Sequence, residues 1–159
     1  MRLGEKTIET LVGKVCDMTT DHVEAGGIPF GALVADHQGT VIATGFNCVR
    51  EDHDPTAHAE IVACRQAAHR LGQASLGGTT LIASGEPCAM CYMVARYAGI
   101  GRIVFALSRH DAARAGFDYR RSYGLLAVDP LDWRDISVEH LQTTRAWEPF
   151  ERFLARGER

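Results

Sequence analysis

The sequence predicts an α/β protein, a three-layer α/β/α sandwich around a central mixed sheet of about five strands. Apolar residues recur at helical spacing near both ends of the chain, and short β-branched runs alternate with helical segments between them. The 159 residues are enough for one domain, residues 1–159, with its own core. A hydrophobic content of 46% with 23% charged residues excludes a disordered chain.

The first half of the chain predicts a helix, a hairpin and a second helix. Apolar residues at helical spacing indicate a helix over residues 5–24. Two short apolar runs then flank a glycine-containing turn, which is typical of a hairpin. A polar loop follows, and then a helix closed by Gly72. The two strands, the loop and the second helix are expected at residues 31–36, 40–45, 49–56 and 57–71.

The second half of the chain alternates strand, helix and strand. This order implies βαβ units and a partly parallel sheet with helices on its faces. Residues 108–134 show no pattern, and long loops of this kind often bind ligands. A short last strand and an amphipathic helix complete the chain. The successive elements are expected at residues 79–84, 88–97, 102–107, 136–141 and 145–156.

Two short motifs predict the chemistry. His58-Ala59-Glu60 is followed, 28 residues after the glutamate, by Cys88 and Cys91 of the segment PCAMC. One histidine and two cysteines make three zinc ligands and leave a fourth tetrahedral position open for water. Zinc lowers the pKa of such a water toward about 7, and Glu60 can carry its proton. The combined H-x-E…P-C-x-x-C pattern is the signature of zinc-dependent deaminases of bases and nucleosides.

Both motifs fall at the start of a predicted helix. Pro87 suits the first helical position, and Cys88 and Cys91, three residues apart, share a helix face. In a regular helix His58 and Glu60 would point about 160° apart. They can share a site only if the first turn of that helix is irregular.

The cysteines allow other interpretations. The C-x-x-C pair could be a redox dithiol, but it lacks the aromatic residue and internal Gly-Pro of thioredoxin-like sites. A purely structural zinc would need a fourth ligand, for which His53, Cys64 and His110 are candidates. The combined motif favours a catalytic zinc. The remaining cysteines (Cys16, Cys48, Cys64) are expected to be buried fillers, and four histidines (His22, His37, His69, His140) to be solvated.

Charge and hydropathy limit the partners. A formal charge of −3 argues against a large nucleic-acid surface. No apolar run approaches the roughly 20 residues that span a bilayer, so no membrane partner is expected. The first ten residues lack the apolar core of a secretory signal, and the five cysteines are an odd number. These features predict a cytoplasmic protein.

From about Phe30 to Phe153 the chain resembles the cytidine deaminase superfamily, and four stretches resemble its guanine deaminases. These are PFGA at 29–32, DPTAHAE at 54–60, EPCAMC at 86–91 and HDAARAGFD at 110–118. The last is the most discriminating, because the first three also occur in tRNA adenosine deaminases. The resemblance implies a zinc-dependent hydrolase that converts guanine to xanthine and ammonia.

The resemblance also implies roles for particular residues. Asn47 would hydrogen-bond the base, Phe30 would pack near it, and the backbone N–H of Ala59 would hold a substrate carbonyl. Tyr97 aligns with an aromatic residue that stacks on the base. Residues 143–159 would close a neighbouring subunit's site in a swapped homodimer; packing on their own chain is the alternative.

One position departs from the resemblance. Guanine deaminases carry an acidic residue directly after Gly-Phe-Asp, understood to relay a proton from the amine, and Tyr119 stands there in this chain. A phenol with a pKa near 10 is a poor substitute for a carboxylate. Either Asp118 takes the relay role, or the pocket suits another aminated heterocycle. Gly85 also stands where the family often has a bulkier residue.

Several alternatives therefore stay open. The substrate could be cytosine, a nucleoside, or another aminated purine, pterin or triazine. The segments at 56–60 and 100–105 also fit a tRNA adenosine deaminase, but glutamates interleave the arginines of the C-terminal helix. A non-catalytic zinc protein is disfavoured, because Glu60 would have no structural purpose there.

Overall fold

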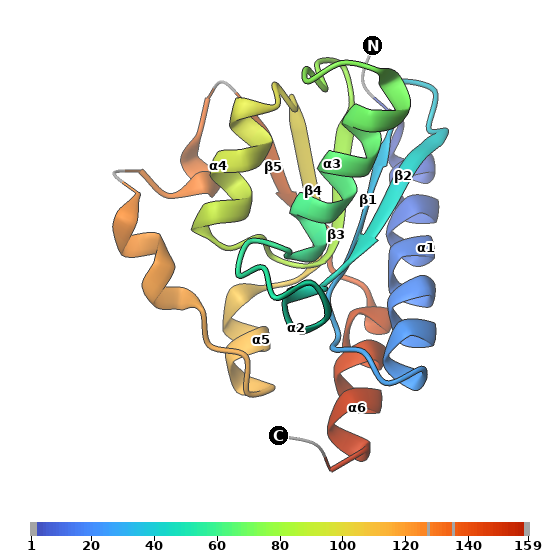
Figure 1. The fold of residues 1–159 in the computed structure, drawn as a ribbon, viewed down its shortest axis with the longest axis vertical. Coiled ribbons are helices and arrows are strands. Elements are labelled where there is room, and N and C mark those ends of the chain that lie inside the picture. Colours follow the sequence, from blue (N-terminus) through green and yellow to red (C-terminus); the bar gives the residue numbers. More distant parts are fainter. Residues whose placement is uncertain (1–2, 127, 135, 158–159) are drawn as a thin grey trace.

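A mixed sheet of five strands lies between two layers of helices in the computed structural model, which describes residues 3–126, 128–134 and 136–157 (Figure 1). The strand order is β2-β1-β3-β4-β5. β1 pairs antiparallel with β2 and β3, whereas β3–β4 and β4–β5 are parallel. The predicted fold class is thus confirmed. The strands are β1 (Gly31–Ala35), β2 (Val41–Phe46), β3 (Thr80–Gly85), β4 (Arg102–Leu107) and β5 (Ser137–His140).

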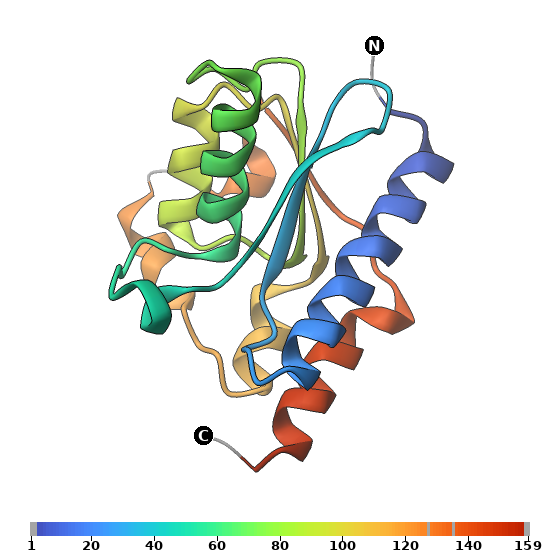
Figure 2. The ribbon, with the colours of Figure 1, turned by 45° about the vertical axis from the view of Figure 1, so that its right-hand side comes forward.

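The helices cover both faces of the sheet (Figure 2). One layer holds α3 (Ala59–Leu71) and α4 (Ala89–Tyr97), and the other holds α1 (Glu5–Glu24) and α6 (Glu148–Ala155). Alternation along the strands explains the two layers, because successive side chains point to opposite faces. Leu33 of β1 packs in the core beneath α1, whereas its neighbours Ala32 and Val34 pack beneath α3.

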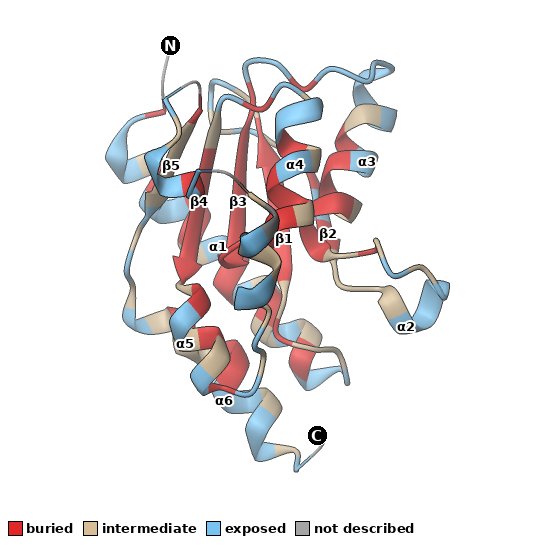
Figure 3. Ribbon diagram, turned by 90° about the vertical axis from the view of Figure 1, so that its left-hand side faces the viewer, coloured by how far each residue is buried: buried red, intermediate tan, exposed pale blue. Residues whose placement is uncertain are grey.

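The three inner strands β1, β3 and β4 are buried along most of their length, the edge strands β2 and β5 are only partly covered, and the helices expose their outer faces (Figure 3). Helix α1 buries one stripe, including Ile8, Leu11 and Val15, against the sheet. It ends before Gly26, whose φ of 103° is a left-handed conformation that favours glycine. None of the helices in the described ranges has the length and apolar character needed to cross a bilayer.

Three sequence-based expectations need correction. The polar loop expected at 49–56 begins with a short helix, α2 (Val49–Asp52). The irregular segment at 108–134 contains α5 (Arg109–Arg114) and two 3-10 turns, η1 (Arg120–Leu125) and η2 (Pro130–Asp132). All four elements are six residues or shorter, so their hydrophobic periodicity is too brief to detect. The expected C-terminal helix is split into a 3-10 turn, η3 (Thr144–Trp147), and α6.

The surplus cysteines largely follow the expectations, whereas two of the four histidines make specific contacts. Cys16 and Cys64 are buried, and burial raises their thiol pKa values to about 11 and about 12, as suits inert fillers. Cys48 is half-buried. His22 is not freely solvated: its ring stacks on Phe46 with centroids 4.2 Å apart, because Gly27 leaves room for it. The His140 ring stacks on Phe105 with centroids 5.1 Å apart, and its Nε2 lies 3.0 Å from the carbonyl oxygen of Ala106.

Candidate zinc site and substrate cavity

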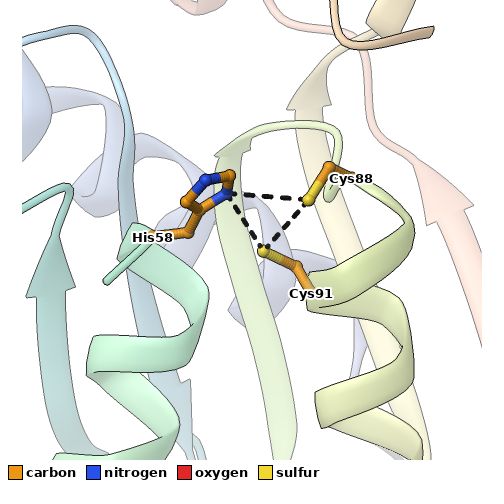
Figure 4. Close-up of side chains that lie close together, drawn as sticks. All are labelled: His58, Cys88 and Cys91. Atoms are coloured by element: carbon orange, nitrogen blue, oxygen red, sulfur yellow. Dashed lines mark hydrogen bonds between the residues drawn. The ribbon is translucent and has the colours of Figure 1, made fainter. Parts of the chain in front are cut away.

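Two helix starts meet at the carboxyl end of β3. His58 directly precedes α3 and Cys88 directly precedes α4, each with an extended backbone (φ −68°, ψ 154° and φ −71°, ψ 171°). Cys91 follows in the first turn of α4. Figure 4 shows the three side chains converging between the two helices. The helix starts therefore supply all three candidate ligands.

This local geometry resolves the difficulty with the first motif. His58 lies outside the helix, so the regular spacing of 100° per residue does not separate it from Glu60. A helix that begins after His58 thus removes the need for an irregular first turn. For the second motif, α4 begins at Ala89, so Pro87 is two residues before the helix rather than at its first position. Because the backbone of Cys88 is extended, α4 begins only at the next residue.

The distances between the ligand atoms fit tetrahedral zinc. Nδ1 of His58 lies 3.6 Å from both Sγ atoms, and the two Sγ atoms are 3.7 Å apart. Zn–S bonds of about 2.3 Å and a Zn–N bond of about 2.0 Å at tetrahedral angles require about 3.5 Å between nitrogen and sulfur and about 3.8 Å between the two sulfurs. His58, Cys88 and Cys91 are the one such group within the described ranges, so His53, Cys64 and His110 supply no fourth ligand there.

The charges of the trio also suit a metal. A hydrogen bond from Cys91 lowers the pKa of the Cys88 thiol to about 4, and the same bond with burial raises the pKa of Cys91. Zinc is bound by thiolates, so metal binding would release any thiol proton that remains.

Glu60 lies beside the trio without belonging to it. Its side chain is buried, with 6% exposed, and Oε2 accepts a hydrogen bond from Sγ of Cys91 at 3.4 Å. Burial raises the pKa of this carboxyl to about 7. A carboxyl of this kind can both accept and donate a proton near neutral pH.

A cavity of about 260 Å³ opens onto these groups. Of the residues expected at the substrate, Phe30, Asn47, Ala59, Asp118 and Tyr119 line it. Sequence reasoning missed two apolar lining residues, which adjoin motifs it had identified. These are Ile28, just before PFGA, and Phe117, within the Gly-Phe-Asp stretch; Glu86 also lines the cavity.

The polar groups of the cavity wall are held by local hydrogen bonds. Oδ1 of Asn47 accepts from the backbone N–H of Val49 at 3.2 Å, which leaves the amide NH₂ to donate to a ligand. The N–H of Ala59 is the first amide of α3 and has no partner within its helix. The wall thus offers donors to a carbonyl or ring nitrogen.

Phe30 is fixed by its neighbours on both sides. The Ser84 hydroxyl accepts from the N–H of Gly31 at 3.0 Å and donates to the carbonyl of Pro29 at 3.3 Å. The Phe30 ring fills the space over Gly85, where a Cβ atom would lie 3.0 Å from its Cε1. The small residue at position 85 therefore accommodates the aromatic wall of the cavity.

Tyr97 is placed differently from the expectation. It is the last residue of α4, 87% exposed, and is not among the residues that line the cavity. The rise of about 1.5 Å per residue puts it about 12 Å along the helix from Ala89. Within one chain, Tyr97 therefore does not stack on a ligand near Cys88.

The two residues that follow Phe117 have separate partners. Asp118 is exposed and pairs with Arg120, and this hydrogen bond lowers the pKa of its carboxyl to about 2. The Tyr119 hydroxyl donates to the backbone carbonyl of Glu86 at 2.7 Å, and burial raises its pKa. Neither group is poised to exchange a proton near neutral pH.

The C-terminal helix lies against its own chain. Phe150 of α6 is fully buried beside Phe30, with ring centroids 5.5 Å apart. Phe153 and Leu154 line a wider cavity of about 690 Å³, which shares Asn47 and Phe117 with the inner one. An exchange of this helix between subunits stays a prediction.

A mixed three-layer sandwich with a His-Cys-Cys trio and a buried glutamate defines a zinc-dependent deaminase of the cytidine deaminase-like fold. The family model for the cytidine and deoxycytidylate deaminase zinc-binding region matches residues 5–107. The chain belongs to this family.

Relatives agree with the assignment. The guanine deaminase of Bacillus subtilis is 37% identical over 150 residues, covering 89% of this chain and 94% of that protein. Its crystal structure superposes with a TM-score of 0.71 at 33% identity, over 99% of this chain and 96% of that one. The structure of the guanine deaminase of Nitrosomonas europaea superposes with a TM-score of 0.76 at 25% identity, over 98% of this chain and 86% of that one. A tRNA-specific adenosine deaminase of Haemophilus influenzae is 38% identical over 60% of this chain and 56% of that protein.

Proposed function

We propose that this protein hydrolyses guanine to xanthine and ammonia. The observation that carries the proposal is the convergence of a zinc-competent trio and the buried Glu60 on one small cavity. The similarity to the Bacillus subtilis guanine deaminase over 89% of the chain supports guanine as the substrate. Zinc bound by the trio supplies a Lewis acid that activates water at neutral pH.

The residues of the cavity have complementary roles. The Asn47 amide donates to the base, the N–H of Ala59 binds its carbonyl, and Phe30 with Phe117 flanks the ring. Glu60 takes one proton from the attacking water and passes it to the ring nitrogen. It then takes the proton of the new hydroxyl at C2 and passes it to the departing amine, which leaves as ammonia. A C–O bond forms at C2, the C2–N bond breaks, and one water is consumed for each ammonia released.

The size of the cavity favours a free base. Its 260 Å³ lies below the range of about 300–1,000 Å³ that is usual for drug-sized ligands. A purine base has few enough atoms for such a space, whereas a nucleoside would extend into the wider cavity beside it.

A second substrate class is favoured by one observation. Tyr119 occupies the position of the expected acid, and its hydroxyl is committed to Glu86. Another aminated purine, pterin or triazine is then the alternative, with the same hydrolytic chemistry. A tRNA substrate is disfavoured, because arginines near the cavity such as Arg114 and Arg120 pair with aspartates.

The proposal extends to the assembly and its setting. We infer a cytoplasmic homodimer acting on a small nucleobase-like molecule, with residues 143–159 as the candidate exchanged segment. Phe153 and Leu154 line the wider cavity of their own chain, so the same helix would cover the partner's cavity if it were exchanged. Light scattering of the purified protein reports the number of subunits.

The test is ammonia release by zinc-loaded protein over a panel of heterocycles. The panel contains guanine, guanosine, cytosine, cytidine, adenine, adenosine, isoguanine, pterins and aminotriazines. Release from guanine above all others supports the proposal. If guanine releases no ammonia and another compound of the panel does, guanine is not the substrate, but the proposed hydrolytic deamination stands.

A further inference from the structure

Three neighbouring backbone groups of the cysteine loop are bonded by side chains from one distant segment. The Tyr119 hydroxyl donates to the carbonyl of Glu86 at 2.7 Å, and the Tyr123 hydroxyl donates to the carbonyl of Pro87 at 2.5 Å. The Ser122 hydroxyl accepts from the N–H of Ala89 at 3.2 Å. These bonds enclose Cys88 on both sides, although they span more than 30 residues of sequence.

The start of α4 explains why the loop needs outside support. A helix start usually has a Ser, Thr, Asp or Asn whose side chain caps the first free amides. The residue in that position here is Cys88, which makes no capping bond and serves as a candidate ligand. The Ser122 hydroxyl supplies a bond to the first amide from outside the helix.

The supporting segment is itself anchored. The guanidinium of Arg109 lies 3.5 Å from the centroid of the Tyr123 ring. The same residue makes three hydrogen bonds to the buried Glu86 carboxylate, through its backbone N–H and Nε, both at 2.8 Å, and through Nη2. The Tyr119 ring packs edge-on to Phe30 in the cavity wall, with centroids 6.2 Å apart. Both tyrosines are therefore held at the ring as well as at the hydroxyl.

We propose that Tyr119, Ser122 and Tyr123 form a loop clamp that positions Cys88 and Cys91 for the metal, with Tyr119 as a positioning residue. The Tyr119 hydroxyl proton is given to a backbone carbonyl, so it is not passed to the substrate. The acid expected at this position by resemblance is thus replaced by a residue with a different task. Groups that orient metal ligands contribute strongly to metal retention.

Zinc release tests the clamp without any substrate. We expect Tyr119→Phe and Tyr123→Phe to lose zinc to a chromogenic chelator about tenfold faster than the parent protein. Tyr97→Phe is the matched control for metal retention, because its hydroxyl lies on an 87% exposed side chain at the far end of α4. The Co²⁺-substituted clamp variants should show altered visible absorption bands, and the control should not.

Two serine variants, one in the clamp and one outside the site, provide a second and independent test. Ser122→Ala removes a hydroxyl that accepts a backbone N–H at 3.2 Å, and Ser75→Ala removes one that does so at 3.3 Å outside the site. We expect only Ser122→Ala to release zinc faster. If Tyr119→Phe does not fold, judged by circular dichroism, the comparison rests on Ser122→Ala and Tyr123→Phe. Parent rates of zinc release in the folded clamp variants would overturn the proposal.

Activity provides a separate readout, which rests on the proposed function. A clamp that orients the metal predicts a lower kcat with KM changed less than about twofold. If the parent protein is inactive on guanine but the clamp variants release zinc faster, guanine is refuted as the substrate and the clamp is supported. If the parent protein is active on guanine but the variants release zinc at the parent rate, the clamp is refuted and the substrate is supported.

Discussion

His58 and Cys88 occupy equivalent positions at the starts of two different helices, and their ligand atoms lie 3.6 Å apart. Each residue immediately precedes its helix with an extended backbone and makes no capping bond. The positive ends of the two helix dipoles therefore face the candidate metal position, where they favour thiolate and hydroxide over their protonated forms. The same arrangement leaves the first amides of both helices available to a ligand or to the clamp.

Glu60→Gln should abolish turnover and leave zinc content unchanged. The amide keeps the size of the side chain but cannot exchange the proton, which predicts a loss of kcat of at least about 10²–10⁴-fold. Ammonia release and metal analysis on the same sample measure both effects. Glu139→Gln, which alters an ion pair with Arg102 away from the cavity, is the control. Retention of activity in Glu60→Gln would refute the assigned role.

Removal of zinc should lower the melting temperature. The trio joins the starts of α3 and α4, so zinc binds the folded chain in preference to the unfolded one. At a free concentration 100 times Kd, this preference contributes about 2.7 kcal/mol, or roughly 5–10 °C for a domain of this size. Calorimetry before and after chelation measures the shift. Zn²⁺ should restore it and Mg²⁺ should not; equal recovery with both would contradict a thiolate site.

Asp118→Asn should leave the pH dependence of kcat/KM unchanged between about pH 5 and pH 9. The hydrogen bond from Arg120 lowers the pKa of Asp118 to about 2, so the carboxyl stays ionised over this range. At pH 7 only about one molecule in 10⁵ carries the proton that a relay would donate. If the variant loses one limb of the pH profile, Asp118 is a relay after all.

Gly85→Ala should be destabilising, because the new Cβ would lie 3.0 Å from the Phe30 ring, which is packed against Phe150. Crowding of this kind costs about 1–3 kcal/mol, and a displaced ring should also raise KM. Gly101→Ala is the matched control, because its Cβ would meet nothing within 4 Å and is expected to change stability by less than about 0.5 kcal/mol. Urea unfolding compares the two, and equal effects would contradict the role of Gly85.

Arg109→Leu should cost about 3–5 kcal/mol of unfolding free energy, because it leaves the buried Glu86 carboxylate without its partner. Arg65→Leu removes an ion pair with Asp54 whose groups are 53% and 35% exposed, and should cost at most about 1 kcal/mol. Denaturant titration of both variants gives the comparison. Similar losses would mean that Glu86 is stabilised by other contacts.

Much of the architecture was predictable, because long elements repeat their pattern. The helix at 5–24 and the strand at 102–107 have the bounds expected from hydrophobic periodicity alone. Short elements such as α2 and α5 were not predicted, since six residues or fewer make less than two helical turns.

The substrate cavity was harder to predict than the ligands. Metal ligands that belong to short motifs can be predicted from residue type and local spacing, as His58 and Cys88 were. Tyr97 lies away from the cavity of its own chain, which its alignment could not show because it carries no information on how far along α4 the residue lies. The hydroxyl of Ser84 beneath Phe30 had no signal in the sequence, because both of its partners lie more than 50 residues away.

Residue types and spacing alone predicted an α/β sandwich, a zinc ligand set of His58, Cys88 and Cys91, and a glutamate free to move protons. These features depend on local periodicity and on the intrinsic chemistry of side chains, which the order of residues records directly. The partner of Tyr119 was decided only by packing: resemblance suggested a missing acid, whereas the fold brings its hydroxyl to the carbonyl of Glu86. A hydrogen bond between segments 33 residues apart depends on how α4 and η1 are brought together, and that information lies in the tertiary structure.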